Sequence, residues 1–272
     1  MSQKTIYILA IVMAVVHEAK GYGRIDFRRR PRLMGDKISL TSLDPRRMRV
    51  QQKIVIYHNA FRSKVRPTAA NMLKMKWHTG AARTAQRWAD QCLVLEHDNE
   101  TGRYDPNYGA CGQNIFISSH KVPWLFAIET WWLEKNIFRY GGRNELHEIG
   151  HYTQMVWAST HEVGCGIAKC NHEPSSRFSP KVFYNYVCNY CPIGNHARRL
   201  SIPYKIGEPC SLCKQHCKRN LCLNSCPYAD YWVNCGQLHR AFPNWVCNTS
   251  TPQGRDRFRK CRATCVCRHK IK

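Results

Sequence analysis

Histidine and glutamate side chains occur at a spacing that zinc enzymes use. The segment His147-Glu148-Ile149-Gly150-His151 has two histidines one helical turn apart, which hold zinc in one class of proteases, and a glutamate that activates water there. That chemistry needs a helix through all five residues, and Gly150 disfavours a helix. Trp157 stands where metal proteases of one group carry a third histidine. Zinc-dependent hydrolysis by His147, Glu148 and His151 is therefore only a minor alternative.

Cysteines could supply either metal ligands or disulfides. The chain has sixteen, and the pairs Cys188/Cys191 and Cys210/Cys213 have the two-residue gap of zinc ligands. Residues 1–22 combine a polar start, an apolar run and small residues near a cleavage site, which predicts a secretory signal peptide. Because exported chains pass through an oxidising compartment, an even number of cysteines favours a disulfide framework over zinc and leaves no thiolate nucleophile.

Charge narrows the classes of partner. The formal net charge is +24, from 42 Lys and Arg against 18 Asp and Glu, which predicts attraction to polyanions such as anionic glycans or lipids. The cations decorate no nucleic-acid module, so nucleic acid is not expected as a partner. Asn99-Glu100-Thr101 and Asn248-Thr249-Ser250 are acceptor sequences for N-glycosylation and predict surface loops.

The pattern along the chain predicts a mixed body behind a basic arm. Residues 23–49 are rich in arginine and show little apolar periodicity, which predicts an arm, with a cleaved propeptide as the alternative. Apolar residues at helical spacing predict three helices with core stripes at Val50/Ile54/Tyr57/Phe61, Ala81/Ala85/Trp88/Cys92 and Leu125/Ile128/Trp131/Trp132. Strands are predicted at 113–118, 163–169 and 182–190.

The tail differs from this body. Ten of the sixteen cysteines lie between Cys210 and Cys267, and residues 201–272 contain little continuous apolar sequence. A segment with so thin a core needs cross-links, so we expect a stapled appendage. Its aromatic and cationic side chains suit recognition more than catalysis, because cross-links fix a surface before it binds.

Several segments together resemble one family. They are 57–62 (YHNAFR), 71–77 (NMLKMKW), 111–115 (CGQNI), 150–157 (GHYTQMVW), 186–192 (YVCNYCP), 203–207 (PYKIG) and the terminal cysteine ladder. From about Gln51 to Lys272 the chain is similar to the cysteine-rich secretory proteins, a branch of the CAP superfamily that also holds venom allergens and plant pathogenesis-related proteins. The resemblance implies an α+β fold: a three-layer α-β-α CAP sandwich at 50–200, a hinge at 201–223 and a small helical cysteine-rich tip at 224–272.

The resemblance also implies which cysteines pair, a point that spacing alone leaves open. The implied pairs are Cys92–Cys170, Cys111–Cys191, Cys165–Cys188, Cys210–Cys217, Cys213–Cys222, Cys226–Cys267, Cys235–Cys261 and Cys247–Cys265.

A metal cleft is the third implication. Many relatives hold a divalent metal with two histidines and two glutamates, and His151 and Glu134 match that set. Gln113 replaces the other glutamate, and His97 stands one residue further from Cys92 than the usual histidine. The family also places His151 at the start of a helix. Losing a carboxylate lowers the negative charge that favours a cation. We expect at most weak Zn²⁺ binding, and a structural His151–Glu134 pair is the alternative.

The resemblance finally implies a secreted, extracellular, monomeric and non-enzymatic binding protein. Its tip would regulate a membrane ion channel or dock on a receptor of a cell or gamete surface. A lipid or sterol carrier, acting through the body, is the alternative.

Overall fold

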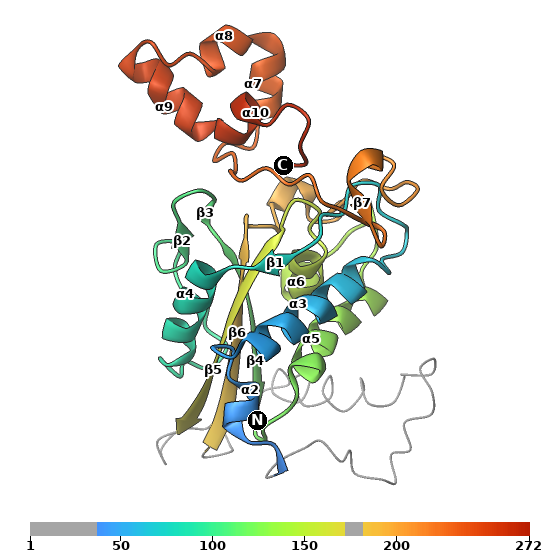
Figure 1. Ribbon diagram of the computed structural model, residues 1–272, viewed down its shortest axis with the longest axis vertical. Helices are drawn as coiled ribbons and strands as arrows, with labels where there is room; N and C mark the ends of the chain where they lie inside the picture. Colours follow the sequence, from blue (N-terminus) through green and yellow to red (C-terminus); the bar gives the residue numbers. More distant parts are fainter. Residues whose placement is uncertain (1–36, 172–181) are drawn as a thin grey trace.

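The computed structural model describes residues 37–171 and 182–272 (Figure 1). The predicted signal peptide and residues 23–36 of the predicted arm lie outside these ranges. No helix within the described ranges is both long and apolar enough to cross a lipid bilayer.

A four-stranded mixed sheet forms the centre of the body, in the order β1-β5-β6-β4. The short β1 (Lys76–Trp77) runs parallel to β5 (Glu162–Asn171). The long strand β6 (Val182–Cys191) pairs antiparallel with β5 on one side and with β4 (Gly112–Ser118) on the other. All three predicted strands are confirmed; β5 extends beyond both predicted ends, and β4 and β6 each extend by one residue at one end.

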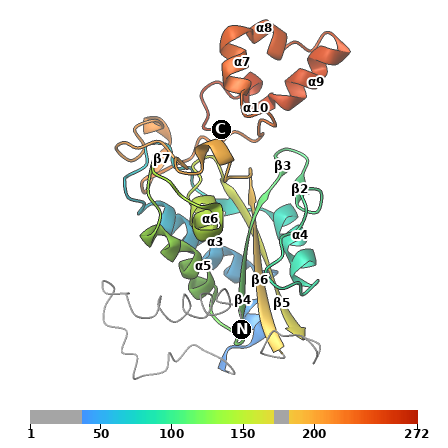
Figure 2. The same ribbon diagram turned by 180° about the vertical axis from the view of Figure 1, so that it is seen from behind.

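Helices cover both faces of this sheet, as Figures 1 and 2 show. One face carries α4 (Thr79–Ala89), and the other carries α3 (Met48–Arg62), α5 (Trp124–Leu133) and α6 (Leu146–Met155). The three predicted helices are α3, α4 and α5. This arrangement confirms the three-layer α-β-α sandwich.

Alternation along β6 sorts its side chains between two cores. Tyr186 and Cys188 belong to the larger core, on the side of α3 and α5. Phe183 and Val187 point to the other face and pack with Ala85 of α4. Because successive strand residues face opposite sides, a strand covered by helices on both faces is buried at almost every position.

Two expectations about the arm and the helix stripes were wrong. The arm does not extend to residue 49, because α2 (Leu40–Leu43) and the start of α3 already pack on the body. Leu43 is buried, and Trp124 Nε1 donates a 2.7 Å hydrogen bond to its carbonyl. Leu125, predicted to be core, is 39% exposed because the buried face of α5 starts at Trp124 and continues through Ile128 and Trp131.

Short elements complete the body and hinge. The body adds a hairpin of β2 (Tyr104–Asp105) and β3 (Gly109–Ala110), and the hinge has a second hairpin of β7 (Cys217–Lys218) and β8 (Leu221–Cys222). The 3₁₀ turns are η2 (Glu134–Asn136), η3 (Ala197–Arg199) and η4 (Lys214–His216).

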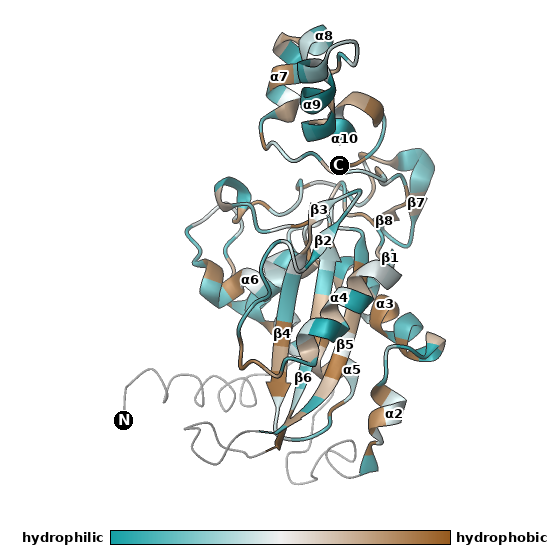
Figure 3. Cartoon of the chain, turned by 90° about the vertical axis from the view of Figure 1, so that its left-hand side faces the viewer, coloured by the Kyte–Doolittle hydropathy of each residue, from teal (hydrophilic) through white to brown (hydrophobic). Residues whose placement is uncertain are grey.

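The tip consists of four short helices around a small core. They are α7 (Cys235–Ala241), α8 (Pro243–Val246), α9 (Pro252–Lys260) and α10 (Arg262–Val266). Cys235, Val246 and Cys261 form much of this core, and Figure 3 shows α9 as mostly hydrophilic. So small an apolar interior explains why three disulfides lie here.

All sixteen cysteines form disulfides, and none is free. The partners are the same as those the resemblance implies: Cys92–Cys170, Cys111–Cys191, Cys165–Cys188, Cys210–Cys217, Cys213–Cys222, Cys226–Cys267, Cys235–Cys261 and Cys247–Cys265. The body therefore holds three disulfides, the hinge two and the tip three.

Candidate functional site

Glu134, directly after α5, and His151 of α6 form a close pair. His151 Nδ1 lies 2.5 Å from Glu134 Oε1, and Glu134 Oε2 accepts a 2.9 Å hydrogen bond from the backbone N–H of Tyr152. The imidazole also stacks on Trp131, with ring centroids 6.1 Å apart. A carboxylate on Nδ1 fixes the ring and leaves Nε2 as the nitrogen for a further partner, which is how outer-shell carboxylates orient metal-binding histidines.

Gln113 forms hydrogen bonds within the protein, at the position where relatives have a glutamate that binds metal. Its Oε1 accepts hydrogen bonds from His97 Nδ1 at 2.9 Å and from the backbone N–H of Asp98 at 3.0 Å. Its Nε2 donates to Asn189 Oδ1 at 3.0 Å. Gln113 thus joins the segment with His97 to the middle of the sheet, and it has no anionic oxygen to offer a metal.

The fit of these residues to zinc is therefore partial. His97 and His151 both use Nδ1 within the protein, which leaves two Nε2 atoms as donors. Burial lowers the pKa of His97, and the charge of nearby Arg103 and His151 acts in the same direction. A neutral imidazole is the form that binds metal. Two nitrogens without a directly facing carboxylate are fewer protein ligands than zinc sites usually have.

The His147-to-His151 motif lies on a helix, contrary to expectation. Helix α6 begins at Leu146, so His151 is not at its start, and the helix passes through Gly150. The Gly150 carbonyl accepts a 2.8 Å hydrogen bond from Asn195 Nδ2, so a tertiary contact holds the residue there. His147 and Glu148 are both exposed to solvent.

Three-ligand clusters are scarce in the part of the chain that the structure describes. Only Cys210, Cys213 and Cys222 bring three ligand atoms of His, Cys, Asp or Glu within 4.8 Å of one another. All three are in disulfides. The histidine motif of α6 therefore has the helical spacing of a zinc protease but not a third protein ligand beside it.

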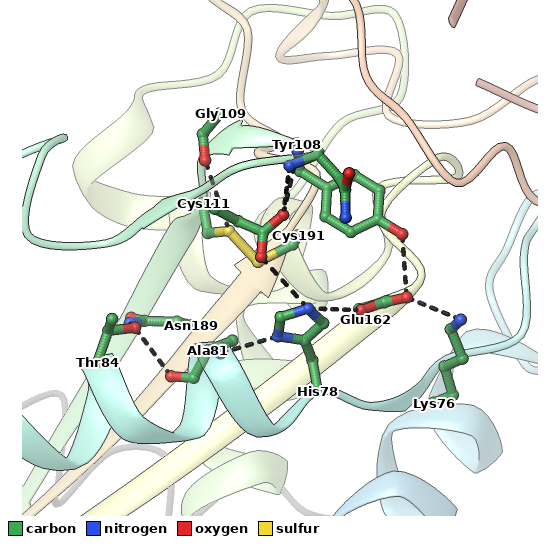
Figure 4. Close-up of polar contacts among 12 residues, drawn as sticks. Lys76, His78, Ala81, Thr84, Tyr108, Gly109, Cys111, Glu162, Asn189 and Cys191 are labelled. Atoms are coloured by element: carbon green, nitrogen blue, oxygen red, sulfur yellow. Dashed lines mark hydrogen bonds and ion pairs between the residues drawn. A yellow bond between two sulfur atoms is a disulfide. The ribbon is translucent and has the colours of Figure 1, made fainter.

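A second polar cluster, which sequence patterns did not predict, is shown in Figure 4. His78 Nδ1 accepts a 2.8 Å hydrogen bond from Ala81 N and so caps α4. Its Nε2 lies 3.1 Å from Glu162 Oε2 and 3.4 Å from Asp105 Oδ2. The other oxygen of Glu162 contacts Lys76 Nζ at 2.8 Å, and Tyr108 donates to it at 3.0 Å.

This cluster supports the β2–β3 hairpin. Lys76 stands directly opposite Glu162 because β1 is parallel to β5, and Asp105 Oδ1 accepts from the backbone N–H of Asn107 at 2.9 Å. Each charged group has a protein partner, which is what buried ionic groups require. Only the pairing of β1 with β5 brings these residues together, so strand spacing by itself could not have revealed them.

The tip rests on the same hairpin. Ala229 N donates a 3.1 Å hydrogen bond to Asn107 O, and Tyr231 OH lies 3.0 Å from Tyr104 OH. A Cβ added at Gly109, where φ is +76°, would come within 2.5 Å of the Tyr231 ring. Glycine is thus needed at position 109 both for the backbone conformation and for this close approach.

One corner of the tip combines exposed apolar groups with cations. Phe242 is 61% exposed and Trp245 47%. Arg257 lies over the Trp245 ring, with its guanidinium carbon 4.2 Å from the centroid, and its Nε donates to the Trp245 carbonyl at 2.9 Å. Trp245 is half exposed because Val246 takes the buried position of α8.

The two glycosylation sequences lie at the surface. Asn99 and Asn248 are exposed. Asn99 Oδ1 accepts hydrogen bonds from Thr101 Oγ1 at 2.6 Å and Gly102 N at 2.7 Å, and Asn248 Oδ1 accepts one from Ser250 N at 2.7 Å. Glycosylation at either residue stays a prediction.

Comparison with known proteins identifies relatives for both parts of the chain. The family model for the cysteine-rich secretory protein family matches residues 55–190, and the Crisp model matches residues 210–272. Human cysteine-rich secretory protein 2 is 39% identical over 239 residues, covering 87% of this chain and 91% of that protein. Cysteine-rich secretory protein 2 of Cavia porcellus is 40% identical over 239 residues, with the same coverage of the two chains.

A solved structure agrees with the fold of the body. The crystal structure of NaASP2 with Zn²⁺ superposes with a TM-score of 0.52 at 30% identity, covering 65% of this chain and 96% of that one. With sandwich, hinge and tip all present, and with relatives similar over most of its length, this chain belongs to the cysteine-rich secretory protein family.

Proposed function

We propose that this chain is a secreted, non-enzymatic binding protein whose tip acts on a membrane ion channel or cell-surface receptor. The observation that carries the proposal is the tip's exposed corner of Phe242, Trp245 and Arg257. Aromatic and arginine side chains supply most of the energy at protein interfaces. An exposed aromatic group beside a cation suits an acidic site with an apolar rim.

Charge favours the same kind of target. Residues 224–272 carry nine Lys and Arg against Asp230 and Asp256, a net charge of +7. Such a field raises the rate at which a protein meets an anionic surface, including anionic lipids or glycans around a membrane target. Three disulfides hold the tip in shape, so little conformational entropy is lost on binding.

The body supports a non-catalytic role because its polar groups are bound to one another. Glu134 is bound to His151 and Tyr152, and Gln113 to His97, Asp98 and Asn189. We propose that His97 and His151 bind Zn²⁺ weakly through their Nε2 atoms. A zinc ion there would join the two segments that carry these histidines.

The test is whole-cell recording from calcium, potassium and ryanodine-type channels exposed to the full-length protein. We expect block by the wild type, and a loss of about tenfold or more for Trp245→Ala, which corresponds to about 1.4 kcal/mol. Ile137→Ala, at an exposed apolar residue of the body, is the matched control and should block like the wild type. Equal block by all three proteins would place the active surface elsewhere. Absence of block would favour binding to a receptor or lipid.

A further inference from the structure

One cysteine differs from all the others in its access to solvent. Of the sixteen, every one of which lies in the described residues, Cys217 alone is exposed. The rate at which a disulfide reacts with a thiol depends on access to its sulfur atoms. Cys217 is therefore the cysteine that an incoming thiolate reaches first.

The partner of Cys217 lies beside a second disulfide. Cys210 is buried, and its sulfur lies within 4.8 Å of both Cys213 and Cys222, which are bonded to each other. Breaking Cys210–Cys217 would therefore release a thiolate next to a disulfide. Cys210 also has φ +64°, in the left-handed region that disfavours residues with a side chain.

The β7–β8 hairpin places Cys217 directly opposite Cys222. Arg219 and Asn220 form its turn with φ of 53° and 63°, as a two-residue hairpin requires. Cys222 N donates to Met72 O, and Cys222 O accepts from Lys74 N, both at 2.8 Å. The backbone N–H and C=O of Cys222 thus form their hydrogen bonds with residues other than Cys217. Cys217 and Cys222 are therefore a non-hydrogen-bonded pair of the hairpin, and in such pairs the two side chains lie closer together than in hydrogen-bonded pairs.

The body already contains a disulfide between two cysteines that stand directly opposite each other on neighbouring strands. Cys165 and Cys188 stand directly opposite each other in the β5–β6 ladder and are bonded. Before the hairpin in the hinge, Cys213 N donates a 2.9 Å hydrogen bond to Cys210 O, so a turn brings Cys210 and Cys213 together. The same backbone conformation therefore also places the cysteines close enough for a second pairing, Cys210–Cys213 with Cys217–Cys222.

We propose that the hinge is a thiol-exchange site that changes between these two pairings when a low-molecular-weight thiolate reaches Cys217. The thiolate attacks Cys217 Sγ, forms a mixed disulfide and releases the Cys210 thiolate. Cys210 attacks Cys213 Sγ, forms Cys210–Cys213 and releases the Cys222 thiolate. Cys222 attacks Cys217 Sγ, forms Cys217–Cys222 and returns the external thiolate. Two disulfides are present before and after, so no oxidant or reductant is consumed.

The exchange acts at the junction between body and tip. Cys210, Cys213 and Cys222 pack with Leu73 of the body, and Leu212 N donates to Ala70 O at 3.1 Å. In the observed pairing, two disulfides tie residues 210–213 to the hairpin at 217–222. In the second pairing, no disulfide joins these two segments, and only packing and hydrogen bonds keep them together.

Peptide mapping of the full-length protein separates the two states. Trypsin cuts after Lys205, Lys214, Lys218 and Arg219. In the observed pairing, peptide 206–214 stays linked to both 215–218 and the peptide that starts at Asn220. In the second pairing, 206–214 is released with one internal disulfide, and 215–218 is linked to the peptide that starts at Asn220.

The protein is treated with substoichiometric reduced glutathione at mild alkaline pH, quenched with an alkylating reagent and digested. We expect a transient glutathione adduct on Cys217, formed about tenfold faster than at any other cysteine, and then release of internally bonded 206–214. The double variant Cys210→Ser/Cys217→Ser, which keeps Cys213–Cys222, should release none. Earlier reaction at Cys92, Cys247 or Cys265 in the wild type would overturn the proposal, as would an adduct on Cys217 that leaves Cys213–Cys222 intact.

Discussion

The side-chain oxygen of Gln113 lies 2.9 Å from His97 Nδ1. The same oxygen accepts the backbone N–H of Asp98, so Gln113 determines which nitrogen of His97 carries a proton. His97 Nε2 is left as the nitrogen that could accept a further partner. The family position of a glutamate is thus filled by a neutral residue that orients a histidine.

Gln113→Glu should strengthen zinc binding. A carboxylate beside His97 raises the negative charge near Nε2 and the basicity of the ring, and outer-shell changes of this kind alter metal affinity by about tenfold or more. Isothermal titration with Zn²⁺ measures the change. His151→Ala in the Gln113→Glu background is the control and should remove the gain. Equal affinities for wild type and Gln113→Glu would show that His97 and His151 do not bind the same ion.

The same substitution should lower stability. Gln113 Nε2 donates to Asn189 Oδ1, and Asn189 Nδ2 in turn donates to Thr84 Oγ1. A carboxylate oxygen at that place faces another acceptor, so we expect a loss of about 1–3 kcal/mol in the free energy of unfolding. Urea unfolding followed by circular dichroism measures it. An unchanged urea midpoint would mean that the side-chain amide of Asn189 flips to donate to the new carboxylate at no cost in free energy.

Two buried histidines should make the body sensitive to acid. Burial is the main cause that lowers the pKa of His58 and of His161, each to about 4. An unfolded chain has histidine pKa values near 6.5, so between about pH 6.5 and 4 it binds protons that the folded chain does not. The free energy of unfolding should therefore fall as the pH is lowered through this window, by up to about 3 kcal/mol per histidine, and then level off.

Unfolding by urea at a series of pH values checks this expectation. His161→Gln should flatten part of the pH dependence, whereas His120→Gln, at an exposed position, should leave it unchanged. A pH profile of the wild type that is flat from 6.5 to 4 would contradict the pKa values of both buried rings.

Arg62 should be essential for folding of the body. It is fully buried and donates to the carbonyls of Leu73, Met155, Trp157, Ala158 and Thr160. Burial lowers its pKa to about 9. Arg62→Met leaves these acceptors without partners, so we expect a loss of more than about 4 kcal/mol in the free energy of unfolding. Arg83→Met, at an exposed arginine, is the matched control. Similar free energies of unfolding for the two variants would contradict the role of Arg62.

Tyr231→Ala should loosen the contact of tip and body. The variant loses the hydroxyl contact with Tyr104 and the ring packing on Gly109. Hydrogen exchange of residues 104–110 should increase at least severalfold, because local opening costs less free energy. Tyr228→Ala, which removes a ring beneath Arg262 within the tip, should leave exchange in that hairpin unchanged. Equal exchange in wild type and Tyr231→Ala would mean that other contacts hold the hairpin.

The sequence by itself determined α3, α4 and β6, because their apolar residues recur with the period of a helix or of a strand. The cysteine pairs and the cleft residues came from the resemblance, since spacing leaves the pairing open. The sequence could not show that Gly150 lies within a helix, because a tertiary hydrogen bond from Asn195 offsets its low propensity.

Only the tertiary structure decided which polar groups meet. Lys76 and Glu162 are 86 positions apart and pair through the register of β1 with β5. Gln113 reaches Asn189 because β4 and β6 are neighbours and the two residues face each other in their register. The proximity of Cys210 to Cys213 and Cys222 depends on how these three cysteines pack on Leu73. Periodicity records which face of an element is buried, but contacts between distant residues depend on strand order and register, which a single sequence does not contain.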